Sequence, residues 1–227
     1  SHGVRIDVFG AVGDYLGSGN DGMGMHMHGN AQDQVAQIHK SGELVVHGDV
    51  GQCYGYGAKG GRLFVLGNAA GRPMINAVGS PKVVINGTAL DYLAESFMAG
   101  DPLEGGGFVI INGMMFDQRG EMLSLETPYP GGNLFSLASG GAIYVRDPHK
   151  RLSDSQLNGG AFTEMTDLDW AVVEPLLQRN EEHFGIPLQR LLTVDGEVAS
   201  PAEVYRKIIP VKSKMLHAEA AWAGHAD

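Results

Sequence analysis

Histidines form a group of side chains whose type and spacing suggest metal chemistry. Four of them lie close together in the sequence: His26, His28, His39 and His47. Imidazole is a common metal ligand, and if one turn of a stacked structure separates His28 from His47, their rings lie within about 5 Å. No carboxylate or cysteine recurs with them, and a stack of polar side chains, like Asn86 and Asn112 further along, explains them equally well. We predict no metal site and leave open whether His26, His28 and His47 hold an ion.

The glycine-rich loop 55–60 (GYGAKG) has the composition of a phosphate-binding loop. Such a loop holds phosphate at the N-terminus of the helix that follows it. Here the next residues, 62–65 (RLFV), predict a strand. We therefore interpret loop 55–60 as a tight turn.

Cys53 is the single cysteine of the chain. A single cysteine excludes an internal disulfide framework and any cysteine-rich zinc or iron–sulfur site. A nucleophilic role requires a basic partner, and no histidine shares the position of Cys53 in the repeat described next. We expect a small, buried structural residue.

A glycine-rich sequence repeat indicates the fold that positions these side chains. Glycine accounts for 34 of the 227 residues, about twice the usual share, and 29 of the 34 precede residue 151. Blocks of similar sequence begin at Gly10, Gly29, Gly48, Gly67 and Gly87, at a nearly constant spacing. An internal period of about 20 residues predicts a solenoid.

Short runs of β-branched and aromatic residues precede most of these glycines and predict strands. They cover residues 24–28, 43–47, 62–66, 83–86, 108–112 and 142–145. A repeat unit this short has no room for a crossover helix between its strands. The fold class is therefore mainly β: a parallel β-helix of about seven coils over residues 4–150. Between 114 and 138 we expect a longer excursion from the coils.

Stacking the coils in register produces rows of side chains. The inward rows are Met25, Leu44, Leu63 and Val83, then Met27, Val46, Val65 and Ile85. The outward row begins with His26 and continues with Val45, Phe64, Val84 and Ile110. An outward apolar stripe must be covered, so these last four are interface candidates, to be covered by the C-terminal segment or by another protein.

The corners of the coils explain the glycines, because positive φ or close contact excludes a side chain there. The predicted structural corners are Gly48, Gly51, Gly55, Gly57, Gly60, Gly61, Gly67, Gly140 and Gly141. Asp14, Asp33 and Asp91 recur at one corner, which indicates a turn-capping role.

Residues 151–212 are predicted to be a helical C-terminal segment. Thr166–Asp169 forms a capping box, and an apolar face that includes Leu168, Val172 and Leu176 predicts a helix to Phe184, bent or split at Pro175. Ser200 opens a second predicted helix that Pro210 limits. Residues 213–227 are predicted to be a mobile tail.

The charge of the chain limits its partners. Its 26 acidic and 16 basic residues give a net charge of −10, with an isoelectric point near 5.3, the wrong sign for nucleic acids or anionic membranes. No apolar run approaches the length of a membrane-spanning helix, and no leader pattern opens the sequence. We expect a soluble, cytoplasmic protein.

Several blocks resemble the GXGXG domain, the C-terminal domain of the glutamate synthase large subunit. They are residues 48–63 (GDVGQCYGYGAKGGRL), 67–72 (GNAAGR), 91–100 (DYLAESFMAG) and 139–145 (SGGAIYV). The resemblance covers roughly residues 4–150 and implies a right-handed β-helix without catalytic residues, which packs between a glutamine amidotransferase part and an FMN and iron–sulfur synthase part.

The resemblance implies that this chain corresponds to the detached form of the domain. FMN and iron–sulfur clusters are then expected on partner subunits and no cofactor on this chain, whose partners are protein subunits of a larger oxidoreductase of glutamate biosynthesis and nitrogen metabolism. Self-association is left open. One alternative is a scaffold similar to the β-helix subunit of formylmethanofuran dehydrogenase or of the formyltransferase/hydrolase complex. Another is a β-helix that itself binds a ligand or metal.

Overall fold

The computed structural model describes residues 3–117, 119 and 121–211. The protein is mainly β, and most of its strands form one nine-stranded sheet. In spatial order these strands are β1 (Arg5–Phe9), β2 (Asp21–His28), β3 (Ser41–Val46), β4 (Arg62–Val65), β5 (Lys82–Ile85), β6 (Phe108–Ile111), β9 (Ala142–Arg146), β13 (Tyr205–Pro210) and β10 (Gly160–Thr163). The six strands predicted from the sequence are confirmed as β2–β6 and β9.

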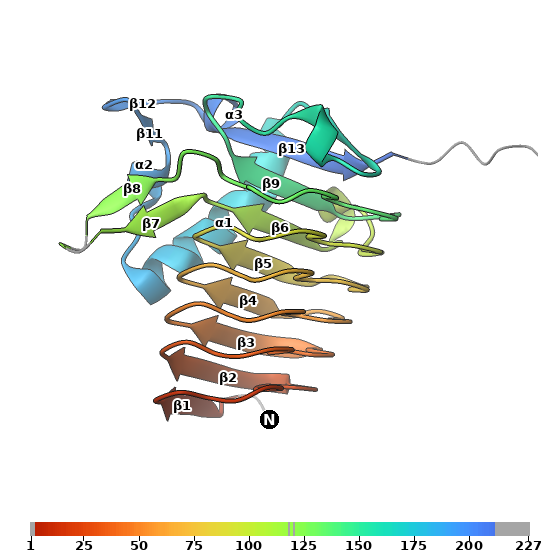
Figure 1. Cartoon of the computed structure of the whole chain (residues 1–227), viewed down its shortest axis with the longest axis vertical. Coiled ribbons are helices and arrows are strands. Elements are labelled where there is room, and N and C mark those ends of the chain that lie inside the picture. Colours follow the sequence, from red (N-terminus) through yellow and green to blue (C-terminus); the bar gives the residue numbers. More distant parts are fainter. Residues whose placement is uncertain (1–2, 118, 120, 212–227) are drawn as a thin grey trace, which may run out of the picture.

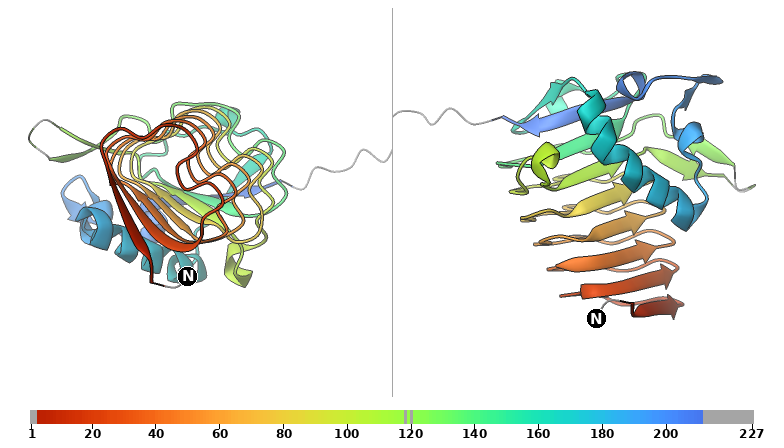
Figure 2. Two further views of the ribbon diagram at one scale, coloured as in Figure 1. Left: turned by 90° about the horizontal axis from the view of Figure 1, so that it is seen from below. Right: turned by 180° about the vertical axis from the view of Figure 1, so that it is seen from behind.

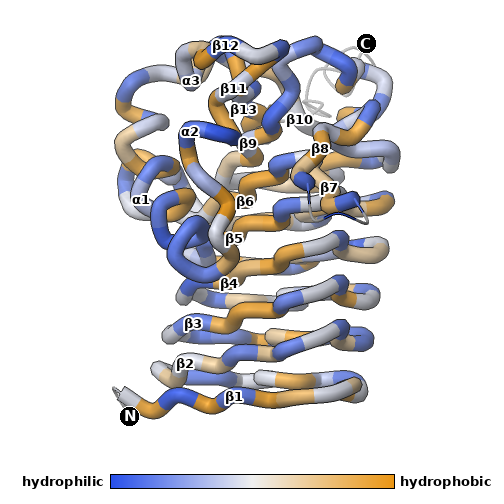
Figure 3. The backbone as a smooth tube through the Cα atoms, turned by 90° about the vertical axis from the view of Figure 1, so that its left-hand side faces the viewer, coloured by the Kyte–Doolittle hydropathy of each residue, from blue (hydrophilic) through white to orange (hydrophobic). Residues whose placement is uncertain are grey.

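The strands β1 to β6 and β9 are all parallel, and each turn of chain stacks on the one before it (Figure 1). Viewed along the stack, successive turns nearly superimpose (Figure 2, left). Pairing is in register: Leu44 lies opposite Leu63, and Leu63 lies opposite Val83. Both predicted inward rows belong to one buried hydrophobic cluster, and the apolar residues concentrate in the strands (Figure 3).

Left-handed backbone geometry recurs in the turns at alternating residues. Cys53, Gly55 and Gly57 have φ values of 57°, 67° and 61°. One turn later Arg72, Met74 and Asn76 adopt φ values of 60°, 62° and 57°. The left-handed conformation therefore belongs to the turn itself, and glycine is not required at each of these positions.

The far end of the sheet is closed by antiparallel strands. β13 pairs with β9 and β10 pairs with β13, so the second predicted helix begins where expected but does not extend to Pro210. The Ser200 capping box is present, but α3 spans Pro201–Val204 and the chain then enters β13 at Tyr205. Pairing with the open edge of β9 outweighs the helical signal. Residues 213–227, the predicted tail, lie outside the described residues.

Helix α1 (Asp167–Phe184) lies obliquely across the outer face of the strands (Figure 2, right). The predicted capping box is confirmed: Thr166 is the N-cap, and its side chain accepts from the Asp169 backbone. The helix continues through Pro175, so the predicted split is wrong. Its buried apolar residues include Val173 and Leu177 with Leu176, whereas the predicted Leu168 is 68% exposed.

Smaller elements fill the connections. They are the 3₁₀ helices η1 (Pro102–Glu104) and η2 (Asp154–Gln156), the helix α2 (Leu188–Leu191), and two antiparallel hairpins, β7 (Met114–Phe116) with β8 (Met122–Ser124) and β11 (Thr193–Val194) with β12 (Glu197–Val198). The β7–β8 hairpin lies in the expected excursion. Among the described residues, no helix has both the length and the apolar character that crossing a membrane requires.

Candidate functional site

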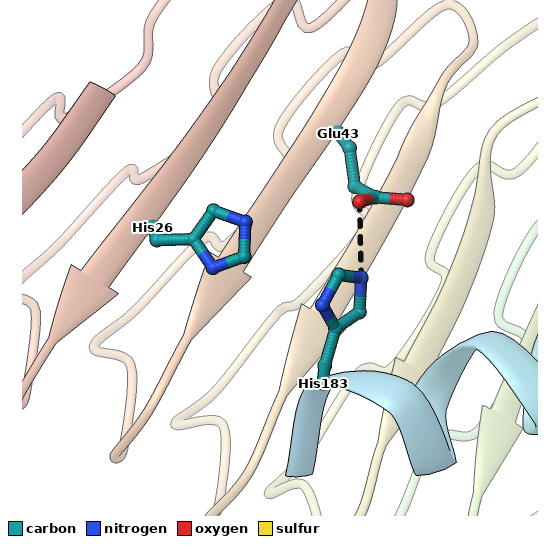
Figure 4. Close-up of side chains that lie close together, drawn as sticks. All are labelled: His26, Glu43 and His183. Atoms are coloured by element: carbon teal, nitrogen blue, oxygen red, sulfur yellow. Dashed lines mark ion pairs between the residues drawn. The ribbon is translucent and has the colours of Figure 1, made fainter. Parts of the chain in front are cut away.

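Three side chains with metal-ligating atoms meet where the C-terminal end of α1 packs on the strands. His26 comes from β2, Glu43 from β3 and His183 from the last turn of α1. One ligand atom from each lies within 4.8 Å of the other two. Figure 4 shows the His26 ring next to the His183 ring, with the ion-pair contact between His183 and the Glu43 carboxylate marked.

Glu43 is held by two arginines. Arg179 Nη2 donates to Oε1 at 2.7 Å and its Nε donates to Oε2 at 3.1 Å, while Arg62 Nε lies 3.1 Å from Oε2. Burial alone would raise the pKa of Glu43, but its contacts with His183 and Arg179 outweigh burial and bring the pKa to about 2. The carboxylate is therefore ionised and fixed in orientation.

His183 approaches Glu43 without forming a hydrogen bond. Its Nε2 lies 3.0 Å from Glu43 Oε1, yet this nitrogen has no hydrogen-bond partner among the described residues. The two atoms are within ion-pair distance (Figure 4), but the ring N–H is not aligned with the oxygen well enough for a hydrogen bond. The His183 side chain is 6% exposed, so Nε2 is a buried polar atom that needs a partner.

His26 is buried and stays neutral. Burial first, and then the charges of Arg5 and His183, lower the pKa of His26 to about 4. Its ring lies 5.3 Å from the His183 ring and 5.9 Å from the His47 ring. A neutral imidazole has a free lone pair, which is the form that binds metals.

The other predicted histidines have separate surroundings. His28 stacks on His47 with ring centres 4.8 Å apart, as their shared repeat position predicts. The Nε2 atom of His28 lies 2.8 Å from Asp7 Oδ1. His39 is fully buried beside Gly61, in the connection just before β3. Sequence reasoning missed Glu43 and His183. Glu43 lies two residues before Val45 of the outward row, so the repeat could have placed it on the same face of the strands, whereas His183 lies on a helix outside the repeat.

A buried amide network fixes the C-terminal half of α1 to the strands. Asn180 and Asn86 exchange two side-chain hydrogen bonds of 2.9 Å. Asn112 donates to Asn86 Oδ1 at 2.9 Å, and the Tyr205 hydroxyl donates to Asn112 at 2.8 Å. Asn86 and Asn112 thus form the stacked pair that the repeat predicts, and the helix extends it.

The predicted interface candidates lie beneath α1. Val45, Phe64, Val84 and Ile110 are each 0% exposed and belong to one cluster with Val173, Leu176 and Leu177 of the helix. The row is covered by this chain's own C-terminal segment, the first of the two alternatives. It is therefore no exposed docking surface for a partner, because the apolar face of α1 occupies it.

The predicted corner glycines fall into two groups. Gly55, Gly57, Gly61 and Gly141 have positive φ. A side chain at any of the other five, Gly48, Gly51, Gly60, Gly67 and Gly140, would overlap atoms of the adjacent turn.

The aspartates of the repeat cap the adjacent turn. Asp14 accepts from the Asp33 backbone, and Asp33 accepts from that of Gln52. Asp91 accepts from Gly132, so the predicted capping role is confirmed at all three positions.

Two further predictions concern the segment 53–60. β4 follows this loop and no helix does, which confirms the turn. Cys53 is half-buried, and burial raises the pKa of its thiol. A raised pKa disfavours the thiolate that a nucleophile needs.

A separate pocket of about 310 Å³ lies among the β7–β8 hairpin, the β11–β12 hairpin and the end of β9. Arg146 lines it, but its guanidinium donates to the carbonyls of Leu191 and Thr193 and to the Ser124 hydroxyl. These contacts hold the connections together, and the guanidinium is directed to them.

Comparison with known proteins gives one family. The model of the family described as GXGXG motif matches residues 1–194. No curated protein matches the chain.

Proposed function

The chain belongs to the GXGXG motif family, and on this premise we propose that it is a non-catalytic structural β-helix of a glutamate synthase-like oxidoreductase. In this role it docks an amidotransferase part and an FMN-binding synthase part. The flavin and iron–sulfur cofactors then reside on those partners. The resemblance of residues 48–63 and 91–100 to glutamate synthase supports this assignment over the alternative of a scaffold in a formyl-transfer enzyme.

We assign residues 4–150 to a right-handed parallel β-helix. The in-register parallel pairing of β1 to β6 and β9 supports this assignment. Parallel β-bridges also link successive turns at a second position, from Val12 through Ala31, Val50 and Ala69 to Ala89. Residues 151–211 cover one face and one end of this stack. They combine α1 with β10 and β13, and so act as cover and cap.

The observation that carries the docking proposal is the difference between the two ends of the sheet. β13 and β10 cover the last coil strand, β9, and leave β10 as one edge strand of the sheet, whereas no further strand among the described residues pairs beyond β1 at the other end. Apolar side chains are exposed at this end, with Phe9 76%, Tyr15 51% and Ile6 37% accessible. An open strand edge with exposed apolar groups fits pairing and packing against another domain or subunit.

Reconstitution tests this function. The chain is co-expressed with the amidotransferase and the FMN-synthase encoded in the same genome, and the mixture is separated by size-exclusion chromatography with light scattering. We expect a complex that Phe9→Asp abolishes and Leu137→Asp preserves. Leu137 is a matched control because it is 77% exposed on a turn.

Two outcomes contradict the proposal. One is separate elution of wild-type chain and both partners. The other is assembly with a molybdenum or tungsten formyl enzyme in their place. The isolated chain is expected to lack visible absorption, and stoichiometric flavin or iron–sulfur bands would refute the assignment of cofactors to the partners.

A further inference from the structure

We propose that His26, Glu43 and His183 form a binding site for a divalent first-row transition metal such as Zn²⁺, which clamps the end of α1 to β2 and β3. Two imidazoles and one carboxylate suit Zn²⁺, Co²⁺ and Ni²⁺. The proposal rests on the geometry of these three side chains and is independent of the proposed docking function.

The pair formed by His183 and Glu43 has the spacing of two ligands on one ion. Two donor atoms bonded to one ion at about 2.1 Å are roughly 3.0 Å apart at a right angle and 3.4 Å apart in a tetrahedron. His183 Nε2 and Glu43 Oε1 are 3.0 Å apart. Nε2 also has no hydrogen-bond partner of good geometry among the described residues, so a metal ion between it and the carboxylate would supply the partner that this buried nitrogen lacks.

His26 supplies the third ligand from β2, where its ring lies next to the His183 ring (Figure 4). The three donor atoms lie within 4.8 Å of one another. This upper limit is about 1.4 Å longer than the distance between two donors of a tetrahedral site. Rotation of the His26 ring toward His183 closes this difference. The three ligands leave a fourth position for water, which the half-exposed end of the histidine stack, at His28, can admit.

Glu43 retains a free position although two arginines contact it. A carboxylate has about four lone-pair positions. Arg179 uses two of them through hydrogen bonds, and Arg62 contributes an ion-pair contact at Oε2. These arginines act as the outer hydrogen-bond partners that orient a metal-bound carboxylate. Their positive charges oppose cation binding, so we expect micromolar rather than nanomolar affinity.

Cobalt titration of the whole chain, stripped with a chelator, tests the site. We expect one Co²⁺ per chain, visible d–d absorption, and displacement by Zn²⁺. His26→Asn leaves the Glu43–Arg179 pair in place and should weaken Co²⁺ binding at least tenfold. His28→Asn is the matched control on the same strand and should leave the Co²⁺ affinity within about twofold.

Thermal unfolding provides a second measurement. Zn²⁺ at one hundred times its Kd should raise the Tm of the wild type by about 5 to 10 °C, and His183→Asn should remove this rise while circular dichroism shows a folded chain. The proposal is overturned if wild-type protein binds no Co²⁺. It is equally overturned if His26→Asn and His183→Asn bind Co²⁺ like the wild type, or if His28→Asn loses as much affinity as they do.

Discussion

The carboxylate of Asp169 lies 2.6 Å from the ammonium of Lys207, and this contact joins the first turn of α1 to β13. The same carboxylate accepts from the Tyr144 hydroxyl at 2.7 Å and from the Thr166 backbone at 2.9 Å. Asp169 is 0% exposed. One buried group thus completes the helix cap and links α1 to two neighbouring strands of the sheet, β9 and β13.

Replacing Asp169 by Asn should lower the free energy of unfolding by about 2–4 kcal/mol, because the cap weakens and Lys207 keeps a buried charge without its partner. Urea unfolding measures this change. Asp167→Asn, two residues earlier and exposed, is the control and should change stability by less than about 0.5 kcal/mol. Equal effects of the two substitutions would contradict the role of Asp169.

The contribution of Asp169 should depend on pH. Burial would raise the pKa of this carboxyl, but Lys207, Thr166 and Tyr144 outweigh burial and hold it below the ordinary value of 3.8. A group whose folded pKa is lowered stabilises above its unfolded pKa and loses that contribution as pH falls through the folded value. The stability difference between wild type and Asp169→Asn should therefore be constant from pH 7 to 5 and shrink below about pH 4. A difference that grows in acid would contradict this sign.

Truncation of a buried apolar residue beneath α1 should destabilise the protein much more than truncation of an exposed one on the helix. Phe64→Ala should cost about 3–5 kcal/mol, because Phe64 is fully buried and truncation leaves a cavity. Leu168→Ala, on the exposed side of α1, should cost less than about 1 kcal/mol. The double change Phe64→Asp and Val84→Asp should unfold the isolated chain, as measured by circular dichroism. A folded monomer with both aspartates would contradict the covering role of α1.

Two corner glycines should differ although both have positive φ. A side chain at Gly61 would overlap the His39 ring, so Gly61→Val should destabilise strongly. At Gly57 the nearest atom to an added Cβ is 3.9 Å away, and Asn76 adopts the same conformation one turn later. Gly57→Asn should therefore shift Tm by only a few degrees. A larger loss for Gly57→Asn than for Gly61→Val would contradict this distinction.

The strand register could be predicted from the sequence because the repeat carries it. Leu44 and Leu63 occupy the same position in successive units, and a one-residue slip would turn every inward side chain outward. β1 was not among the predicted strands, although Arg5 and Asp7 alternate with Ile6 and Val8 in the two-residue period of a half-buried strand. β13 was assigned to a helix because the local cap at Ser200 is genuine and the pairing with β9 that overrides it is a tertiary contact.

The candidate metal site was only half predictable. His26 stands in the outward row, so the repeat placed it correctly on the face of the strands. Glu43 and His183 lie in distant parts of the sequence, and the packing of α1 alone brings them together. The sequence repeat does not predict where a helix outside the repeat packs on the strands.

The charge around Glu43 makes a further prediction about the proposed metal site. Arg62 is 52% exposed and contributes a positive charge 3.1 Å from Glu43 Oε2. Arg62→Gln should tighten Co²⁺ binding by about threefold, because it removes a positive charge that repels the cation. Lys40→Gln, an exposed cation outside the site, is the control. Weaker binding in Arg62→Gln would show that orientation of Glu43 matters more than charge.

The paired amides of Asn86 and Asn180 allow the docking of α1 to be measured directly. Asn86→Ala leaves the Asn180 amide buried without its partner and should cost about 2–3 kcal/mol. Asn180→Ala should cost less, because Asn86 keeps its hydrogen bonds to Asn112 and to the Val65 carbonyl. The double variant removes both groups together and should cost less than the sum, with a coupling energy of about 1–2 kcal/mol in a double-mutant cycle from urea unfolding. Gln178→Ala, on the exposed side of the same turn, should be nearly neutral. Strictly additive losses would mean that the two amides stabilise the protein separately, and that the apolar row alone holds the helix to the strands.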